Sequence, residues 1–302
     1  MTEAAAPGHP ALPGGGVLSV ADVAVALDPA LCPPFSAWPG SYRPFLAPAG
    51  SPPARVACLL GDAARHPADS RFVPAYVAGS WQFGEMDGRG LYRFHAAGNR
   101  PYLWAEPNAD FSAVEIWSER EGGRQMPPLL HPVDRVLFMG ILAHRSAFIV
   151  HSCGWTCSGK SVLFPGVSGA GKTTLCRQLL AAGHGRILSD DRVVLRADAA
   201  EFRACGTPWP GDAKQAHNES APLAALAFIE KAPAHRLTPI GPAEALRRLL
   251  EAASIPWYSA DLRDRVLPLV ERLVSRVPAY RLGFHPEPGV ADVLLPLVES
   301  PR

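Results

Sequence analysis

Runs of apolar residues, broken by turn-forming residues, divide the chain into regions with different patterns. Between residues 56 and 117, short runs rich in β-branched and aromatic side chains alternate with turn signals. The clearest are Phe72-Val73, Trp81 to Phe83 and, after an Asp-Gly turn, Leu91 to His95. This pattern predicts a small, largely β domain, to which we give the boundaries 55–128.

From residue 129 onwards, strand-like and helix-like segments alternate. Apolar positions recur at helical spacing over Asp134–His144 and again over Lys172–Ala182, where Gly183 is expected to end the helix. Strand, glycine-rich loop, helix and strand in this order are typical of the βα unit of a nucleotide-binding sheet. We therefore expect an α/β domain over residues 129–300. Its other predicted elements are strands at 147–151, 160–164, 187–188, 193–195, 223–230 and 279–284, and helices at 243–253 and 261–274.

Prolines and glycines dominate the N-terminal stretch. Residues 1–16 consist largely of Ala, Pro and Gly, and the stretch from Pro29 to Pro53 contains prolines that neither a helix nor a central strand tolerates. We therefore predict that residues 1–54 form a flexible leader without a fold of their own.

Composition and charge exclude several classes of protein. The 302 residues are 48% hydrophobic, and a chain this apolar buries enough surface to offset the entropy of ordering, which excludes disorder over its whole length. With 29 basic and 28 acidic side chains, it lacks the cationic excess of a non-specific nucleic-acid binder. The N-terminus lacks the features of a signal peptide, and the longest apolar segment, Val136–Leu142, is far shorter than the roughly 20 residues that span a bilayer. We expect a cytoplasmic protein without nucleic-acid or membrane partners.

Six cysteines lack the paired spacings of a zinc site and the density of a disulfide scaffold. We interpret them as small buried side chains. A redox or metal role for the closest pair, Cys153 and Cys157, is the alternative.

One segment matches a motif with a defined chemical mechanism, the phosphate-binding pattern G-x-x-x-x-G-K-[ST]. An apolar strand precedes it and an amphipathic helix follows it, so that backbone N–H groups and the positive end of the helix converge on phosphate. Lys172, one of only four lysines, supplies charge to the phosphates, and the Thr173 hydroxyl can bind magnesium. The alternative is a glycine-rich turn that matches by chance. The expected nucleotide-binding residues are Gly166, Val167, Ser168, Gly169, Ala170, Gly171, Lys172, Thr173 and Thr174.

Two adjacent carboxylates, Asp190 and Asp191, lie between two apolar runs after the motif. A magnesium–nucleotide site needs a carboxylate at a strand end to hold the metal, and a kinase also needs one to accept the proton of its substrate. Because side chains alternate along a strand, both can face one site only where the chain leaves regular β geometry. The alternative is that one aspartate is catalytic and the other is a turn residue or helix cap.

His151 closes the predicted strand Phe148–His151. If this strand neighbours the one that feeds the loop, the imidazole lies near the carboxylates. The alternative is a structural histidine at the end of an apolar strand.

In the order of these elements, the chain resembles the catalytic domain of the HPr kinase/phosphorylase family, which are bacterial P-loop serine kinases. The resemblance rests on Val150-His151-Ser152, on the loop Gly166–Thr173 and on the run Leu188–Leu195, and it extends over residues 130–300. More narrowly, the chain looks like the divergent HPr-kinase-like proteins, some of which are associated with peptide modification. The segments Gly206–Gly211 and Val277–Leu282 suit this subgroup.

The resemblance implies a fold and a set of residue roles. The fold is the one that HPr kinase shares with phosphoenolpyruvate carboxykinase, a mixed sheet flanked by helices. The cosubstrate is ATP with Mg²⁺, and the catalytic residues are Asp190, His151 and Lys172. Asp190 would act as general base toward a serine hydroxyl, and His151 would hydrogen-bond the Asp190 carboxylate. Asp191 would join Thr173 in holding magnesium.

The chain departs from the family at one place. The family's segment with a metal-binding glutamate followed by Arg-Gly has no counterpart, and Phe202–Trp209 takes its place in the order. This argues against a reverse phosphorylase activity and against the family's usual protein substrate. Asp212 or Glu230 could replace the missing carboxylate, and each is equally well explained as a surface residue.

Three functions remain open. The first is an ATP-dependent kinase acting on a serine, or another hydroxyl, of a peptide or small protein. The second keeps the fold but uses a small-molecule hydroxyl as acceptor, and the third is an ATP-binding regulatory module without transfer. The retained lysine and aspartates favour a kinase, since a pure sensor needs no proton acceptor. The oligomeric state is left open, a homo-oligomer included.

Overall fold

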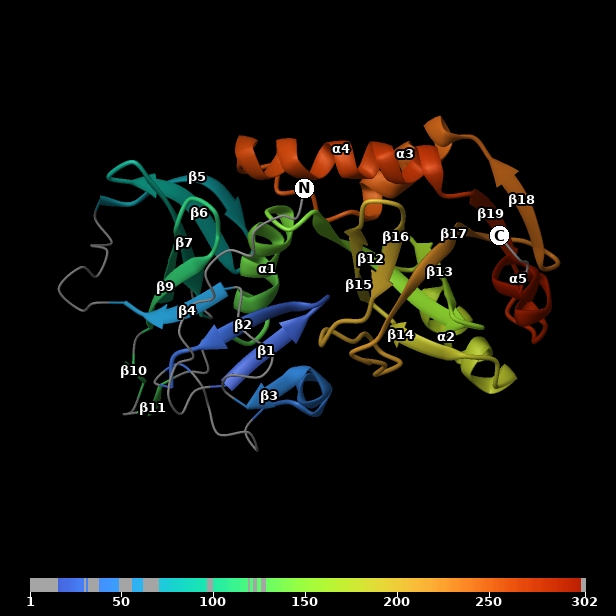
Figure 1. Cartoon of the computed structure of the whole chain (residues 1–302), viewed down its shortest axis with the longest axis horizontal. Coiled ribbons are helices and arrows are strands. Elements are labelled where there is room, and N and C mark those ends of the chain that lie inside the picture. The colour runs from blue at the N-terminus through green and yellow to red at the C-terminus, as the bar shows by residue number, and fades with distance from the viewer. Residues whose placement is uncertain are drawn as a thin grey trace. The chain divides into compact units, whose positions relative to one another are not determined.

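The computed structural model describes residues 16–29, 31, 38–48, 56–61, 71–96, 100–118, 120–121, 124–125 and 129–299. The chain divides into two compact units (Figure 1). The first comprises Met1–Trp38 and Leu46–His144, and the second comprises Pro39–Phe45 and Arg145–Arg302. No helix in the described ranges is both long enough and apolar enough to span a membrane.

The first unit is built on a nine-stranded sheet. Its neighbouring strands are antiparallel, except that β4 runs parallel to both β2 and β9. Helix α1 (Val133–Ala143) and the short hairpin of β10 (Arg120–Glu121) and β11 (Arg124–Gln125) belong to the same unit. The order across the sheet is β3 (Leu46–Pro48), β1 (Gly16–Val20), β2 (Val23–Leu27), β4 (Val56–Leu60), β9 (Ala113–Ser118), β8 (Pro101–Pro107), β7 (Arg89–His95), β6 (Trp81–Met86) and β5 (Val73–Ala78).

Residues 16–27, which we assigned from the sequence to a leader without a fold, form strands β1 and β2. Both strands are largely buried, because this segment is rich in Val, Ala and Leu and contains no proline. Ala21 and Asp22, at φ of 53° and 60°, form the turn between them, as the left-handed turns of two-residue hairpins require. A 3-10 helix, Gly40–Phe45, and β3 follow within the proline-rich stretch. The leader prediction therefore fails for these residues, and residues 1–15 lie outside the described part.

The boundary between the units also differs from the predicted one. Helix α1 groups with the first unit, which ends at His144 instead of at residue 128. The helix packs closely within the first unit. Gly140 of α1 lies so near the Phe111 ring that an added Cβ would come within 2.1 Å of it. The ring of Phe111 also stacks on that of His144, with centroids 5.3 Å apart.

The second unit carries the glycine-rich loop on an eight-stranded mixed sheet. Strands β13, β17 and β19 run parallel, and the remaining pairings are antiparallel. The order is β13-β12-β15-β16-β17-β19-β18, with β14 pairing β12 and with β17 also pairing β13. The strands are β12 (Ala147–Cys157), β13 (Lys160–Pro165), β14 (Arg186–Ser189), β15 (Arg192–Ala197), β16 (Phe202–Cys205), β17 (Ser220–Lys231), β18 (Arg236–Ile240) and β19 (Ala279–Phe284).

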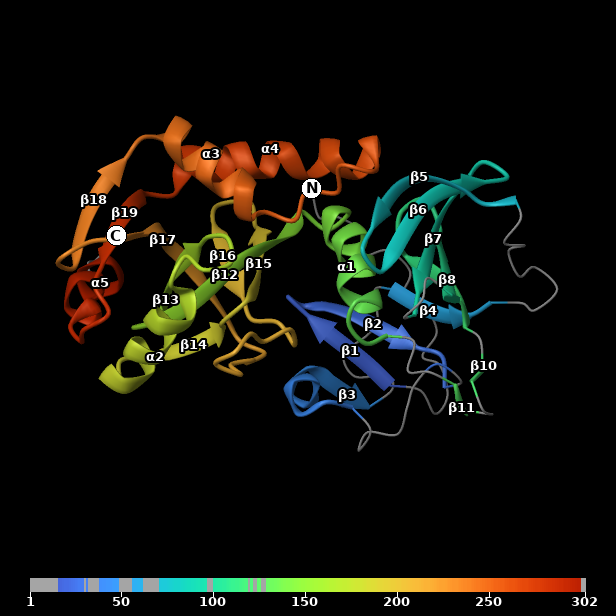
Figure 2. The ribbon, with the colours of Figure 1, turned by 180° about the vertical axis from the view of Figure 1, so that it is seen from behind.

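Helices cover both faces of this sheet (Figures 1 and 2). Helix α2 (Lys172–Ala182) and helix α5 (Val290–Glu299) share a buried cluster with Phe164 of β13 and Ala227 of β17. Helix α3 (Pro242–Ala252), which packs against α4 (Ala260–Arg276), places Arg248 over the ring of Phe228. Since neighbouring residues of a strand face opposite ways, α3 lies on the other face.

The protein is thus a mixed α/β protein with large sheets and few helices. The elements predicted around the loop are confirmed, including the end of α2, where Gly183 takes the left-handed conformation at φ 73°. The sequence pattern missed β16, β18 and α5. Two of these are short strands, and α5 contains Pro296, which conceals its helical pattern.

Two adjacent leucines of α2 test the packing of the second unit. Leu179 is 1% exposed in the cluster beneath the loop, whereas Leu180 is 42% exposed. Leu179→Ala should lower the free energy of unfolding by about 2–5 kcal/mol, because it leaves a cavity. Leu180→Ala is the matched control and should change it by about 0.5 kcal/mol or less. Urea denaturation measures both, and equal losses would contradict this placement of α2.

Candidate functional site

Strand β12 brings the predicted site segments together. It pairs with β13, whose last residue lies opposite Ser152, and with β15, where Arg192 lies opposite His151. Gly166 N, at the start of the loop, donates to His151 O at 3.1 Å, and Ser152 N donates to Asp191 O at 3.0 Å. The glycine-rich loop and the aspartate turn are therefore both attached to the same two residues of β12.

The loop between β13 and α2 has the conformation that its glycines allow. Gly169 and Gly171 have φ values of 83° and 101°, where residues with a Cβ are strained. Val167 is 52% exposed, so this part of the loop stands at the surface. Gly171 is the N-cap of α2, and no described side chain caps the helix. The first N–H groups of α2 can therefore bind an anion, as helix N-termini commonly do.

Lys172 is folded back into this loop. Its ammonium donates to Gly166 O at 2.7 Å and to Val167 O at 2.8 Å, and the residue is only 7% exposed. Burial lowers the pKa of Lys172; the charge of Asp191 opposes this shift, and the charge of Arg192 adds to it. The loop thus holds a buried cation on its own carbonyl oxygens.

Asp191 is the carboxylate that His151 contacts. His151 Nε2 lies 2.9 Å and an Arg192 guanidinium nitrogen 3.1 Å from Asp191 Oδ1, and the Asp191 side chain is 29% exposed. Burial alone would raise the pKa of Asp191. The hydrogen bond from His151 and the charges of Arg192, His151 and Lys172 outweigh burial, so the pKa lies below its usual value. Asp191 is therefore ionised at neutral pH.

Asp190 has a different environment. It is 3% exposed, and its carboxylate accepts three backbone hydrogen bonds. Oδ1 accepts from Gly211 N at 2.9 Å and from Gln215 N at 3.1 Å, and Oδ2 accepts from Ala213 N at 2.7 Å. The expected contact between His151 and Asp190 is therefore wrong. Because successive side chains of an extended chain point in opposite directions, Asp190 faces the backbone of 211–215 while Asp191 faces His151.

The segment 206–217, which we call the clasped loop, is built around this carboxylate. A Cβ on Gly211 would lie 2.9 Å from Asp190 Oδ2, and one on Gly206 would lie 1.9 Å from His217 O. Thr207, fully buried, donates through Oγ1 to Arg192 O at 2.6 Å. In the sequence, this segment serves only as a marker of the family resemblance. The two glycines of the clasped loop, Gly206 and Gly211, are the sequence signal for a loop that closely approaches another part of the chain.

Metal-binding candidates are few. Among the described residues, no group of three or more His, Cys, Asp or Glu could hold a metal ion by itself. Thr173, in the first turn of α2, and Asp191, in the turn between β14 and β15, are the two oxygen donors expected from the sequence. Of the two suggested replacements for the family's glutamate, Asp212 is exposed, and Glu230 is bound to Arg248.

The described cysteines are free thiols. Cys153 is fully buried beside Cys176, and its hydrogen bond with Cys176 together with burial raises its pKa well above the usual value. Such a thiol is a poor nucleophile and metal ligand. This finding supports the interpretation of Cys153 as a buried packing residue.

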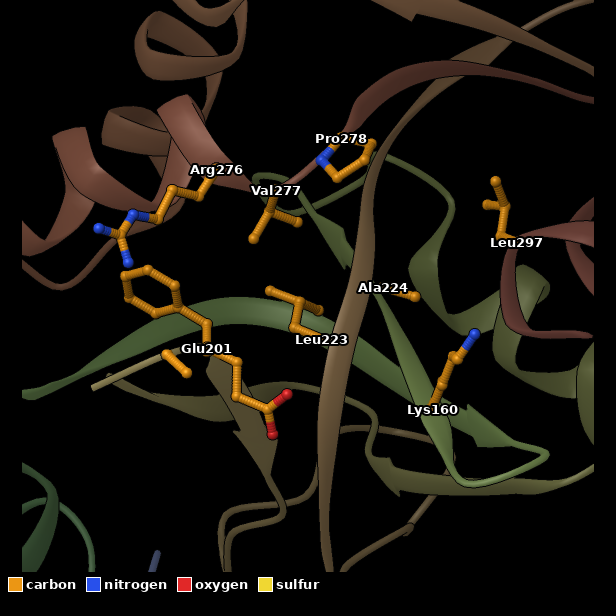
Figure 3. Close-up of a pocket in the computed structure, with 10 residues that line it drawn as sticks. Lys160, Glu201, Leu223, Ala224, Arg276, Val277, Pro278 and Leu297 are labelled. Carbon is orange, nitrogen blue, oxygen red and sulfur yellow. The ribbon is translucent and has the colours of Figure 1, made fainter. Parts of the chain in front are cut away.

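A cavity of about 340 Å³ lies away from these residues (Figure 3). Its lining includes Lys160 at the start of β13, Phe202, Leu223 and Arg276. Gly166 follows the other end of β13, so the cavity and the loop lie at opposite ends of one strand. None of the residues that line this cavity is a site residue predicted from the sequence.

Comparison with known proteins identifies the family. Residues 130–286, just over half of the chain, match the family model described as SynChlorMet cassette protein ScmC, and the chain belongs to this family. No curated protein matches the chain. Among the solved structures that match is the Hpr(Ser) kinase/phosphatase from Coxiella burnetii, at 14% sequence identity and a TM-score of 0.28. That match covers 50% of this chain and 87% of the other.

The two aspartates should respond differently to loss of charge. Asp190→Asn places an amide N–H₂ against backbone N–H donors, and such an unsatisfied buried group costs about 1–3 kcal/mol of stability. Asp191→Asn, at a partly exposed position, should cost less. Urea denaturation of both variants measures the difference, and a larger loss for Asp191→Asn would contradict the role of Asp190 in holding the clasped loop.

Proposed function

We propose that this chain is an ATP-dependent kinase that transfers the γ-phosphoryl group of Mg-ATP to a serine, or another hydroxyl, of a peptide or small protein. The observation that supports this most is that the loop containing Lys172 and the ionised Asp191 are joined to adjacent residues of β12. A phosphate-binding loop alone would suit any nucleotide-binding protein. The carboxylate beside it adds a group that phosphoryl transfer requires. The peptide acceptor is chosen on the resemblance to HPr-kinase-like proteins.

The residues of the loop fit the phosphates of a nucleoside triphosphate. The N–H groups at the start of α2 and the positive-φ glycines suit phosphate oxygens. The Lys172 ammonium would exchange Gly166 O and Val167 O for phosphate oxygens, a change that replaces neutral partners by charged ones. The stronger charge-assisted bonds favour this exchange.

Magnesium would be held by Thr173 and Asp191. Both described partners of the Asp191 side chain contact Oδ1, which leaves Oδ2 for the metal. A magnesium ion held there would supply the positive charge that offsets the negative charge developing during transfer. His151 orients the Asp191 carboxylate and helps to keep it ionised.

The role of Asp190 differs from the one that the resemblance implies. The Asp190 carboxylate is 3% exposed and faces three backbone N–H donors, so a substrate hydroxyl has little access to it. We assign it the positioning of the clasped loop. Phosphoryl transfer passes through a loose transition state and depends mainly on positioning and charge stabilisation, so it makes little demand on a strong base.

A substitution of Lys172 tests the proposal. The assay incubates the protein with γ-³²P-labelled ATP, magnesium and a positional-scanning library of serine peptides. Lys172→Met should lower the rate of label transfer about a hundredfold or more, because it removes the cation that stabilises the transferred group. Loss of ATP affinity, measured by isothermal titration calorimetry, should accompany it.

Lys160→Met is the matched control, because Lys160 lies at the other end of the same strand. It should leave both measurements unchanged. Retention of the label on ATP in every wild-type reaction, with ATP binding intact, would contradict a kinase that acts on serine peptides; retention also after addition of a low-molecular-weight lysate fraction would favour a regulatory ATP-binding module. Equal activity of the two variants would contradict the assigned role of Lys172.

A further inference from the structure

A second cavity of the same unit, of about 410 Å³, lies at the edge of the sheet that carries the loop. Because β13, β17 and β19 are parallel, their carboxyl ends meet at one edge, which is where ligands of α/β sheets bind. The loop follows β13. The cavity, which we call the distal cavity, is lined by residues 230–236 at and after the end of β17 and by Gly283 near the end of β19.

A short chain of contacts connects the loop to the distal cavity. A Cβ at Gly171 would lie 3.7 Å from the Phe284 ring, so this ring lies beside the end of the loop. The Phe284 ring is 5.5 Å from the ring of His235, which lines the cavity. His235 Nε2 lies 2.9 Å from Glu287 O. One aromatic ring therefore separates the phosphate-binding loop from a cavity wall whose imidazole is held in place.

The lining suits a flat, aromatic ligand. Small residues, Ala232, Pro233, Ala234 and Gly283, provide apolar surface without bulk. The His235 ring and the Arg236 guanidinium are planar groups on which a heterocyclic base stacks. At a neighbouring wall, Arg281 and Glu230 belong to an ion-pair network with Arg248 and Glu244, so their charges are largely compensated.

The order of the strands indicates the direction in which a bound nucleotide would extend from the loop. Asp191 and the clasped loop lie on the β12 and β15 side of β13, and the distal cavity lies on its β17 and β19 side. In phosphoryl transfer the acceptor and the leaving group lie on opposite sides of the transferred phosphorus. With the acceptor approaching from the aspartate side, the nucleoside extends toward β17 and β19.

We infer that the distal cavity receives the base of the purine nucleotide whose phosphates occupy the glycine-rich loop. This inference rests on the proposed nucleotide-binding function. The volume of the distal cavity falls within the range of small-molecule sites. The base would lie beside the His235 ring and over the alanines, and Arg236 would stack on its exposed face.

Two probes, Mg-ATP and inorganic tripolyphosphate with magnesium, distinguish the contribution of the base to binding from that of the phosphates. Ala234→Trp fills the cavity, and Arg236→Gln removes a stacking group. Each should weaken ATP binding about tenfold or more, the usual contribution of one stacked base, and should leave tripolyphosphate binding unchanged. Isothermal titration calorimetry on the full chain measures both affinities. Ala224→Trp, which fills the cavity of Figure 3, is the matched control and should change neither.

Each alternative result overturns a stated part of the account. Unchanged ATP affinity in both distal-cavity variants would overturn the inference, and so would an equal loss of both probes, since the loop itself would then be damaged. A changed preference among acceptor peptides with unchanged ATP affinity would assign the cavity to the acceptor and overturn it as well. If the wild-type chain binds neither probe, the proposed function itself fails.

Discussion

The candidate site depends on two backbone hydrogen bonds of one strand. In β12, the carbonyl of His151 accepts from Gly166, and the N–H of Ser152 donates to Asp191. These bonds hold the start of the glycine-rich loop and the aspartate turn beside the same dipeptide, although the two segments are separated by the whole of α2. Backbone bonds of this kind do not depend on side-chain rotamers. They therefore fix the spacing between the start of the loop that contains Lys172 and the aspartate turn.

The electrostatics of the site follow from this spacing. The chain as a whole carries a formal charge of +1, so its net charge contributes little long-range attraction for an anionic ligand. Locally, Lys172, Arg192 and His151 surround Asp191, and their combined effect on its pKa exceeds the opposing effect of burial. The buried ammonium of Lys172 in the loop is thus one of the charges that keep the Asp191 carboxylate ionised. Charge is concentrated where the proposed transfer would require it, around the ends of β12 and β13 nearest the loop.

Much of the loop could be predicted from the sequence, because its structure is local. Gly169, Gly171 and Gly183 occupy positions where the backbone takes positive φ, and such positions are visible as glycines in the right order. The division of labour between Asp190 and Asp191 could not be predicted. It depends on the N–H groups of Gly211, Ala213 and Gln215, which approach Asp190 only when the chain has folded. Strands β1 and β2 were not predicted, because the prolines on both sides of this short buried hairpin dominate the local composition.

The most direct test of the central claim is a crystal structure of the chain with magnesium and a non-hydrolysable ATP analogue. We expect the phosphates against the first N–H groups of α2, with the Lys172 ammonium moved from Gly166 O and Val167 O to the phosphate oxygens. We also expect the metal between Thr173 and Asp191, with Asp190 still bound to the clasped loop. An analogue bound elsewhere, or bound at the loop with Lys172 still on the carbonyl oxygens, would contradict the account.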